Sequence, residues 1–88
     1  MWFKEMFMQQ QYHVISLVIH TIQQQTQHII QQLTQLAGLE LHSHDQDGKL
    51  IVTIEGEHSN HLLDHIETIN QYQGVISSSL IYHHVESI

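Results

Sequence analysis

The sequence has no cysteine, no proline and no arginine, and its only basic side chains are Lys4 and Lys49. Without cysteine, the chain cannot form disulfide bonds, thiolate metal sites or a cysteine nucleophile. Nucleic-acid binding gains its affinity by neutralising phosphates with lysine and arginine, so this composition argues against a nucleic-acid partner. Anionic membrane surfaces are disfavoured as partners for the same reason.

Acidic side chains dominate the charge of this chain. Nine carboxylates give a formal net charge of -7 over 88 residues, which favours basic partners, including basic peptides. The length predicts one domain with one modest core. Hydrophobic residues make up 41% of the sequence, which is enough for a globular fold.

Long hydrophobic runs are also missing, because no segment reaches the roughly 20 apolar residues that a membrane-spanning helix needs. Residues 1–8 are largely apolar, but Lys4 and Glu5 interrupt them and no small-residue cleavage site follows. We therefore interpret residues 1–11 as a mobile extension, residues 12–84 as the folded domain and residues 85–88 as a tail. With no export signal, a cytoplasmic location without membrane insertion is expected.

Hydrophobic alternation predicts four strands, at residues 12–20, 39–44, 49–55 and 74–84. The last of these is apolar on both faces, which is typical of a strand inside a sheet, and it carries three consecutive serines. Charged and imidazole side chains in the strand at 39–44 favour a sheet edge. Asp47 followed by Gly48 predicts a hairpin turn between the second and third strands.

Helical spacing of apolar residues predicts two helices, at residues 22–37 and 59–73. Thr21 and Ser59 are candidate N-caps, and Gly38 and Gly74 are candidate stop signals. The predicted buried stripes are Ile22, Ile29, Ile30, Leu33, Leu36 and Ala37 in the first helix, and Leu62, Leu63, Ile66 and Ile69 in the second.

The order strand, helix, strand, strand, helix, strand predicts an α+β fold of the ferredoxin-like βαββαβ type. Right-handed crossovers place both helices on one face of a four-stranded antiparallel sheet, with the first and third strands in its centre. The first and last strands then become neighbours. The opposite face of the sheet is left bare.

Strand alternation assigns a mixed apolar and small-residue set to this bare face. A patch of that kind usually binds something, and the serines leave room for a ligand to lie close to the sheet. A homodimer that buries the patch, or simple tolerance of exposed apolar surface, are the alternatives. The predicted binding residues are Val14, Ser16, Val18, Ile51, Thr53, Glu55, Ser77, Ser79 and Ile81. Val75 joins them if Ile76, Ser78, Leu80 and Tyr82 point to the helices.

Catalytic and metal-binding patterns are weak in this sequence. His61 and His65 have a spacing compatible with a metal, yet they flank the predicted buried stripe and no metalloprotease pattern surrounds them. His42 and His44 are expected to share one face of their strand, and are interpreted as surface residues. Residues 77–79 offer serine hydroxyls without a nucleophile-elbow motif, so we predict neither catalysis nor a cofactor.

Three segments, residues 15–20, 47–55 and 74–83, together resemble the NapD family of small chaperones of periplasmic nitrate reductase maturation. The resemblance covers residues 12 to about 84. It implies a ferredoxin-like fold that binds the twin-arginine (Tat) signal peptide of the catalytic-subunit precursor and prevents its export until the cofactor is inserted. The resemblance also implies that the peptide lies as a helix on the bare sheet face, which agrees with the acidic, partly apolar surface predicted above.

Two other functions stay open at this point. The same topology occurs in small-ligand regulatory domains of the amino-acid-sensing kind, although those are usually joined to a second domain. Metal binding through His61 and His65 is the other. We expect a monomer or a weak dimer.

Overall fold

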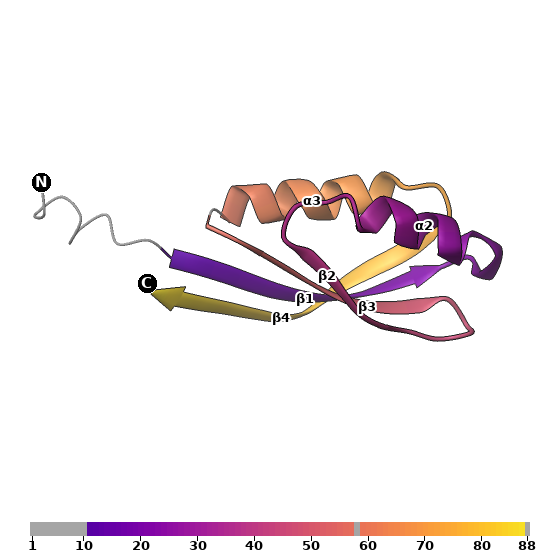
Figure 1. Cartoon of the computed structure of the whole chain (residues 1–88), viewed down its shortest axis with the longest axis horizontal. Helices are drawn as coiled ribbons and strands as arrows, with labels where there is room; N and C mark the ends of the chain where they lie inside the picture. The colour runs from indigo at the N-terminus through magenta and orange to yellow at the C-terminus, as the bar shows by residue number, and fades with distance from the viewer. Residues whose placement is uncertain (1–10, 58, 88) are drawn as a thin grey trace, which may run out of the picture.

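The computed structural model describes residues 11–57 and 59–87. Its elements follow the order strand, helix, strand, strand, helix, strand (Figure 1). They are β1 (Gln11–Thr21), the 3-10 helix η1 (Gln23–Gln25), α2 (Thr26–Leu33), β2 (Leu39–His44), β3 (Lys49–Gly56), α3 (Ser59–Gln71) and β4 (Val75–Ser87).

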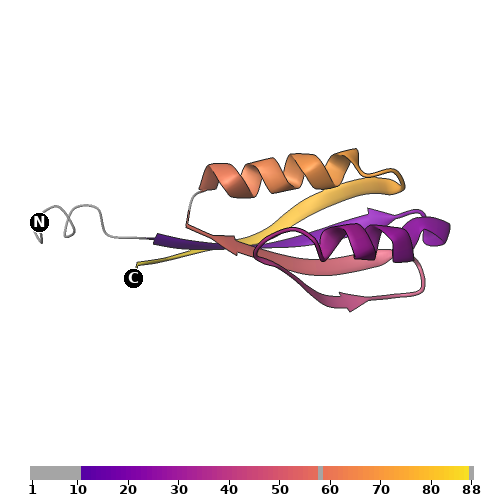
Figure 2. The same ribbon diagram turned by 45° about the horizontal axis from the view of Figure 1, so that its top comes forward.

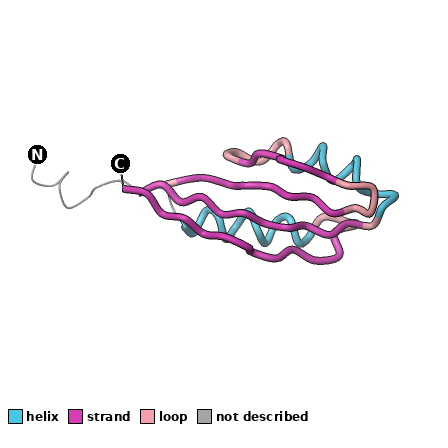
Figure 3. The backbone as a smooth tube through the Cα atoms, turned by 90° about the horizontal axis from the view of Figure 1, so that it is seen from below, coloured by secondary structure: helices cyan, strands magenta, loops and turns pink. Residues whose placement is uncertain are grey.

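The four strands form one antiparallel sheet in the order β2-β3-β1-β4. Both helices lie on one side of this sheet (Figures 1 and 2). Figure 3 views the sheet from its other side, where no helix lies in front of the strands. The predicted ferredoxin-like α+β fold is therefore confirmed, with β1 and β3 in the centre. β2 lies at an edge as predicted, but β4 occupies the other edge and is not an interior strand.

The core lies between the helices and the covered face of the sheet. Alternate residues of the two central strands supply most of it, because successive side chains of a strand point to opposite faces. α2 and α3 close it from above. The buried hydrophobic residues are Ile15, Leu17, Ile19, Ile29, Leu33, Leu50, Val52, Ile54, Leu62 and Ile69.

The first helical segment is shorter than predicted. Ile22 is extended, donates its amide to the carbonyl of Gly74 at 2.7 Å and leaves 47% of its surface exposed. It therefore does not belong to the buried stripe, and Ala37 beyond the helix is exposed as well. Thr21 is not an N-cap; its buried hydroxyl donates to the Gly48 carbonyl at 2.8 Å and lies 2.7 Å from the Thr26 hydroxyl.

α3 and β4 also depart from the predicted pattern. Leu63 was assigned to the buried stripe, but it is 58% exposed beside the buried Leu62. β4 continues to Ser87, which pairs with Gln11, so residues 85–87 are paired strand and not a tail. The predicted extension at residues 1–10 lies outside the described residues, as does the side chain of the candidate cap Ser59.

A tight turn joins β2 to β3, as the Asp-Gly pair predicted. The Asp45 carboxylate accepts hydrogen bonds from the amides of Asp47 at 3.0 Å and Lys49 at 2.9 Å. The Lys49 bond above all lowers the pKa of Asp45 below its usual value. Gly48 adopts a φ of +91°, which side-chain-bearing residues rarely adopt, so glycine is required here.

Candidate functional site

The uncovered side of the sheet, here called the open face, is built on the central strands β1 and β3. Because Ile15, Leu17 and Ile19 point into the core, the alternate residues of β1 point the other way. Those residues, Val14, Ser16 and Val18, are half-buried by their neighbours on the adjoining strands.

Strand register aligns the open face in three rows. Val18 lies opposite Ile51 of β3 and Ser79 of β4. The next rows are Thr53, Ser16 and Tyr82, and then Glu55, Val14 and His84. Ser77 lies opposite His20 at one end. The register thus aligns the predicted binding residues Val18 and Ile51 with Ser79, and Ser77 lies two residues away along β4.

The outer strand β4 carries two irregularities that the sequence did not reveal. Its register against β1 shifts between Leu80 and Tyr82 and again between Val75 and Ser77, so Ile81 and Ile76 have no strand partner. An extra residue of this kind switches the face of the residues beyond it. Two predicted orientations are therefore wrong: Val75 packs against the core, and Tyr82 falls in the row of the open-face residue Ser16.

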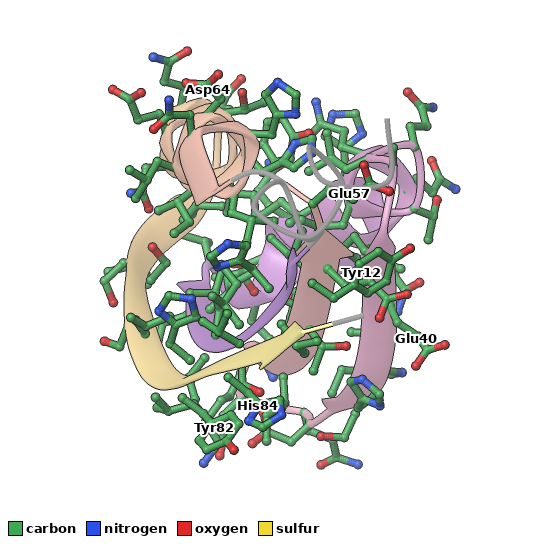
Figure 4. The ribbon with its side chains drawn as sticks, turned by 90° about the vertical axis from the view of Figure 1, so that its left-hand side faces the viewer. Tyr12, Glu40, Glu57, Asp64, Tyr82 and His84 are labelled. Atoms are coloured by element: carbon green, nitrogen blue, oxygen red, sulfur yellow. The ribbon has the colours of Figure 1, made fainter. Side chains whose placement is uncertain are left out.

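Tyr82 and His84 are additions to the open face that alternation did not predict. Their rings are stacked with centroids 6.1 Å apart, and Tyr82 is 56% exposed. Figure 4 shows both residues on the side of the sheet opposite α3, the helix on which Asp64 is labelled. An exposed aromatic ring beside small serine side chains can stack on apolar or cationic groups of a ligand.

Acidic groups gather at the other edge of the open face. A cavity of about 250 Å³ is lined by Gly38, Leu39, Glu40, Thr53 and Glu55. His42 Nε2 lies 2.7 Å from Thr53 Oγ1 and 3.4 Å from Glu40 Oε1. Glu40 and His42 were not predicted as site residues, because only the pairing of β2 with β3 brings them to Thr53.

Histidines do not assemble into a metal site in the described part of the chain, where no group of three or more metal-ligating side chains occurs. His42 and His44, expected on one face, are separated by a register shift, and His44 lies opposite the core residue Leu50. His83 and His84 lie opposite Ile15 and Val14, which face opposite sides of the sheet. His83 instead pairs with His13, with 3.2 Å between Nε2 and Nδ1.

Of the three central serines of β4, one is hydrogen-bonded to α3 and the other two are exposed. The Ser78 hydroxyl donates a hydrogen bond of 2.7 Å to the side-chain carbonyl of Asn70 on α3. Ser77 and Ser79 are exposed and carry no bulk above the sheet. The open face is therefore small and apolar in its middle, aromatic on the flank of Tyr82 and His84, and acidic on the flank of Glu40 and Glu55.

No helix in the part of the chain described here is long and apolar enough to cross a membrane. A family model described as "NapD protein" matches residues 12–87. The chain is 36% identical over 76 residues to Chaperone NapD of Escherichia coli K12, covering 85% of this chain and 87% of the relative. Chaperone NapD of Shigella flexneri matches with the same identity and coverage.

A solved structure shows the same likeness. It is the solution structure of the E. coli Tat proofreading chaperone protein NapD, which superposes with a TM-score of 0.76 at 35% identity, covering 83% of this chain and 78% of that one. The relatives are named chaperones, a role without catalysis. On the family match, the identity and the shared fold, this chain belongs to the NapD family of chaperones.

Proposed function

We propose that this chaperone binds the twin-arginine signal peptide of the catalytic-subunit precursor of periplasmic nitrate reductase. In this proposal the peptide lies on the open face, and its capture prevents export until the cofactor is inserted. The observation that carries the proposal is an uncovered sheet face with serines in its centre, in a chain whose solved relative is named a Tat proofreading chaperone.

Apolar contact supplies most of the proposed affinity. Val18, Ile51 and Val14 offer apolar surface in the centre of the face, and burying such surface contributes about 25 cal/mol per Å². Ser16 and Ser79 let a helical peptide approach the backbone closely, because their side chains add little height. Docking an amphipathic helix on an apolar surface is a common way to recognise a peptide.

The charge of the protein favours the cationic end of such a peptide. Glu40 and Glu55 lie at one edge of the open face, and the formal net charge of the whole chain is -7. Exposed ion pairs of this kind contribute only about 0–1 kcal/mol each, so they orient the peptide more than they hold it. We therefore place the arginine pair near Glu55 and the apolar run over Val18 and Ile51.

Calorimetry with a synthetic peptide that carries adjacent arginines followed by an apolar run tests the proposal. Wild-type protein should bind it, and Ser79→Trp should weaken binding strongly because an indole ring would stand beside Val18 and block the approach to the apolar centre of the face. Gln31→Trp, on the exposed surface of α2, is the matched control and should bind like wild type. Failure of the wild type to bind, or unchanged binding by folded Ser79→Trp, would contradict the proposal.

The choice of precursor needs a separate experiment. The nitrate reductase precursor should be retained by the immobilised protein, and the same precursor without its signal sequence should not. Because a precursor carries its signal peptide before export, the proposal also places this chaperone in the cytoplasm. Equal retention of both forms would show that recognition lies elsewhere in the precursor.

A further inference from the structure

The two edges of the sheet differ in how well they are protected against pairing with another strand. β2, at one edge, is six residues long and carries Glu40, His42 and His44. β4, at the other edge, is thirteen residues long, contains no lysine, arginine or proline, and has Glu86 as its only carboxylate. Short length, charged side chains and proline are the usual protection of an edge strand, so β4 lacks what β2 has.

Exposed apolar side chains are concentrated on this unprotected edge. The structure shows seven large hydrophobic residues as exposed, and five of them belong to β4: Ile76, Leu80, Ile81, Tyr82 and Val85. A sixth, Leu63 of α3, lines a groove of about 180 Å³ together with Leu80, on the covered side of the sheet. Apolar surface gathered in one place usually marks the binding site of a partner.

The backbone of β4 offers a template for such a partner. Among the described strands only β1 lies beside β4, so the peptide groups of Ser77–Leu80 that point away from β1 have no strand to pair with. These four residues lie between the two register shifts of β4 and pair with β1 in regular order. A strand added at this edge can therefore form a regular ladder along Ser77–Leu80.

We infer that this added strand is β4 of a second copy of the chain, paired antiparallel about a two-fold axis beside Ser79. Charge selects this occupant. Each copy has a formal net charge of -7, so two copies repel each other except where their carboxylates are absent. Residues 75–85 contain no Asp or Glu, which lets two such strands meet without like charges in contact. A cationic peptide, in contrast, would find no carboxylate to pair with along this stretch.

Side-chain alternation determines where the axis can lie. Residues that face each other across an antiparallel pair point to the same side of the sheet, so in two identical strands they are separated by an even number of residues. The axis therefore passes beside a residue and not between two. With the axis beside Ser79, Leu80 lies opposite the small Ser78 of the second copy. Both side chains are on the covered side, where Ser78 bonds to Asn70 and Leu80 lines the groove.

This pairing leaves both open faces uncovered, because it continues the sheet sideways and keeps all helices on one side. Dimerisation is therefore independent of the peptide binding proposed above, and either can hold without the other. A regular ladder of four residues is short, so we expect a weak dimer with a dissociation constant between about 10 μM and 1 mM. Added salt should strengthen the dimer, since it screens the repulsion between two acidic copies.

Sedimentation equilibrium of the full chain tests the association. Ile81→Lys should raise the dissociation constant by about tenfold or more, because each copy loses apolar surface and gains a charge at the shared edge. Ile22→Lys makes the same change at an exposed isoleucine outside β4, and should dimerise like wild type. Circular dichroism establishes that both variants are folded.

Cross-linking locates the interface, and the absence of cysteine from the chain makes single-cysteine variants unambiguous. A residue beside the axis faces its own copy at a Cα–Cα distance of about 4.5–5.5 Å, which is within the range of about 4.4–6.8 Å that a disulfide spans. Ser79→Cys should therefore form a linked dimer under mild oxidation. Ser43→Cys on β2 and Ser16→Cys on β1 are the controls. Ser16 would lie at least about 14 Å from its copy, three strand spacings away, and should not link.

Three results would overturn the inference. One is a wild-type chain that sediments as a monomer even at about 1 mM, where a dimer of the expected strength is well populated. Another is a dimer that Ile81→Lys and Ile22→Lys leave equally intact. The third is faster linking of Ser43→Cys or Ser16→Cys than of Ser79→Cys, which would place the interface on β2 or between two open faces.

Discussion

Ser16 of β1 lies directly opposite Tyr82 of β4, whereas the next residue of β1, Leu17, lies opposite Leu80. The residue between, Ile81, is left without a partner. This single insertion turns Tyr82 to the open face beside Ser16, where its ring is 56% exposed. The aromatic flank of the proposed peptide site therefore depends on one irregularity in β4.

Tyr82→Ala should weaken binding of a twin-arginine peptide by about twofold to fivefold, since losing about 20–40 Å² of apolar contact at about 25 cal/mol per Å² costs roughly 0.5–1 kcal/mol. Tyr82→Phe keeps the ring and should bind like wild type. Calorimetry with the same peptide measures both variants. Equal losses for alanine and phenylalanine would show that the hydroxyl group, which lies 3.3 Å from His84 Nδ1, is the important part.

Glu55→Gln should weaken peptide binding by up to about fivefold at low salt, because an exposed ion pair contributes about 0–1 kcal/mol. The difference from wild type should shrink as salt is added, since salt screens exposed charges. Glu67→Gln removes an equal charge from α3, on the other side of the sheet, and serves as the control. If both variants lose affinity equally, net charge and not position determines the effect.

Ile29→Ala should lower the free energy of unfolding by about 2–5 kcal/mol, because the side chain is fully buried in the core. Ile22→Ala should lower the free energy of unfolding by less than about 1 kcal/mol, since this isoleucine precedes the helix and is 47% exposed. Urea unfolding measures both. Similar losses would mean that Ile22 packs in the core as the hydrophobic spacing suggested.

Asp45→Asn should remove an acid-sensitive contribution that the β2–β3 turn makes to the free energy of unfolding. Hydrogen bonding from the Lys49 amide holds the pKa of Asp45 below its usual value in the folded chain. A lowered folded pKa stabilises the fold above the unfolded pKa and loses this effect as the pH falls through the folded pKa. The urea midpoints of wild type and Asp45→Asn should therefore differ at pH 7 and converge in strong acid; a constant difference would contradict this.

Sequence patterning predicted the central part of the fold because its physical causes are local. Leu50, Val52 and Ile54 alternate strictly, and the structure buries all three. The open-face positions of β1 and β3 follow from the same alternation. Asp47 and Gly48 indicated the hairpin because glycine readily adopts the positive φ that a tight turn of this type requires.

The remaining features depend on pairing between distant segments. Alternation counts residues along one strand, so it could not detect that Ile81 and Ile76 lack partners or that His42 interrupts β2. Spacing alone also placed Ile22 in the helix, whereas its amide bonds to Gly74 near the start of β4. Register and long-range hydrogen bonds determined these positions.

The central claim is that the open face receives the peptide, and methyl NMR of the labelled protein with an unlabelled twin-arginine peptide tests it most directly. The account predicts intermolecular nuclear Overhauser effects to the methyl groups of Val14, Val18 and Ile51, and none to those of Leu63 on α3, the helix on the covered side of the sheet. Contacts with Leu63 and Leu80, without any to the open-face methyl groups at saturation, would contradict it.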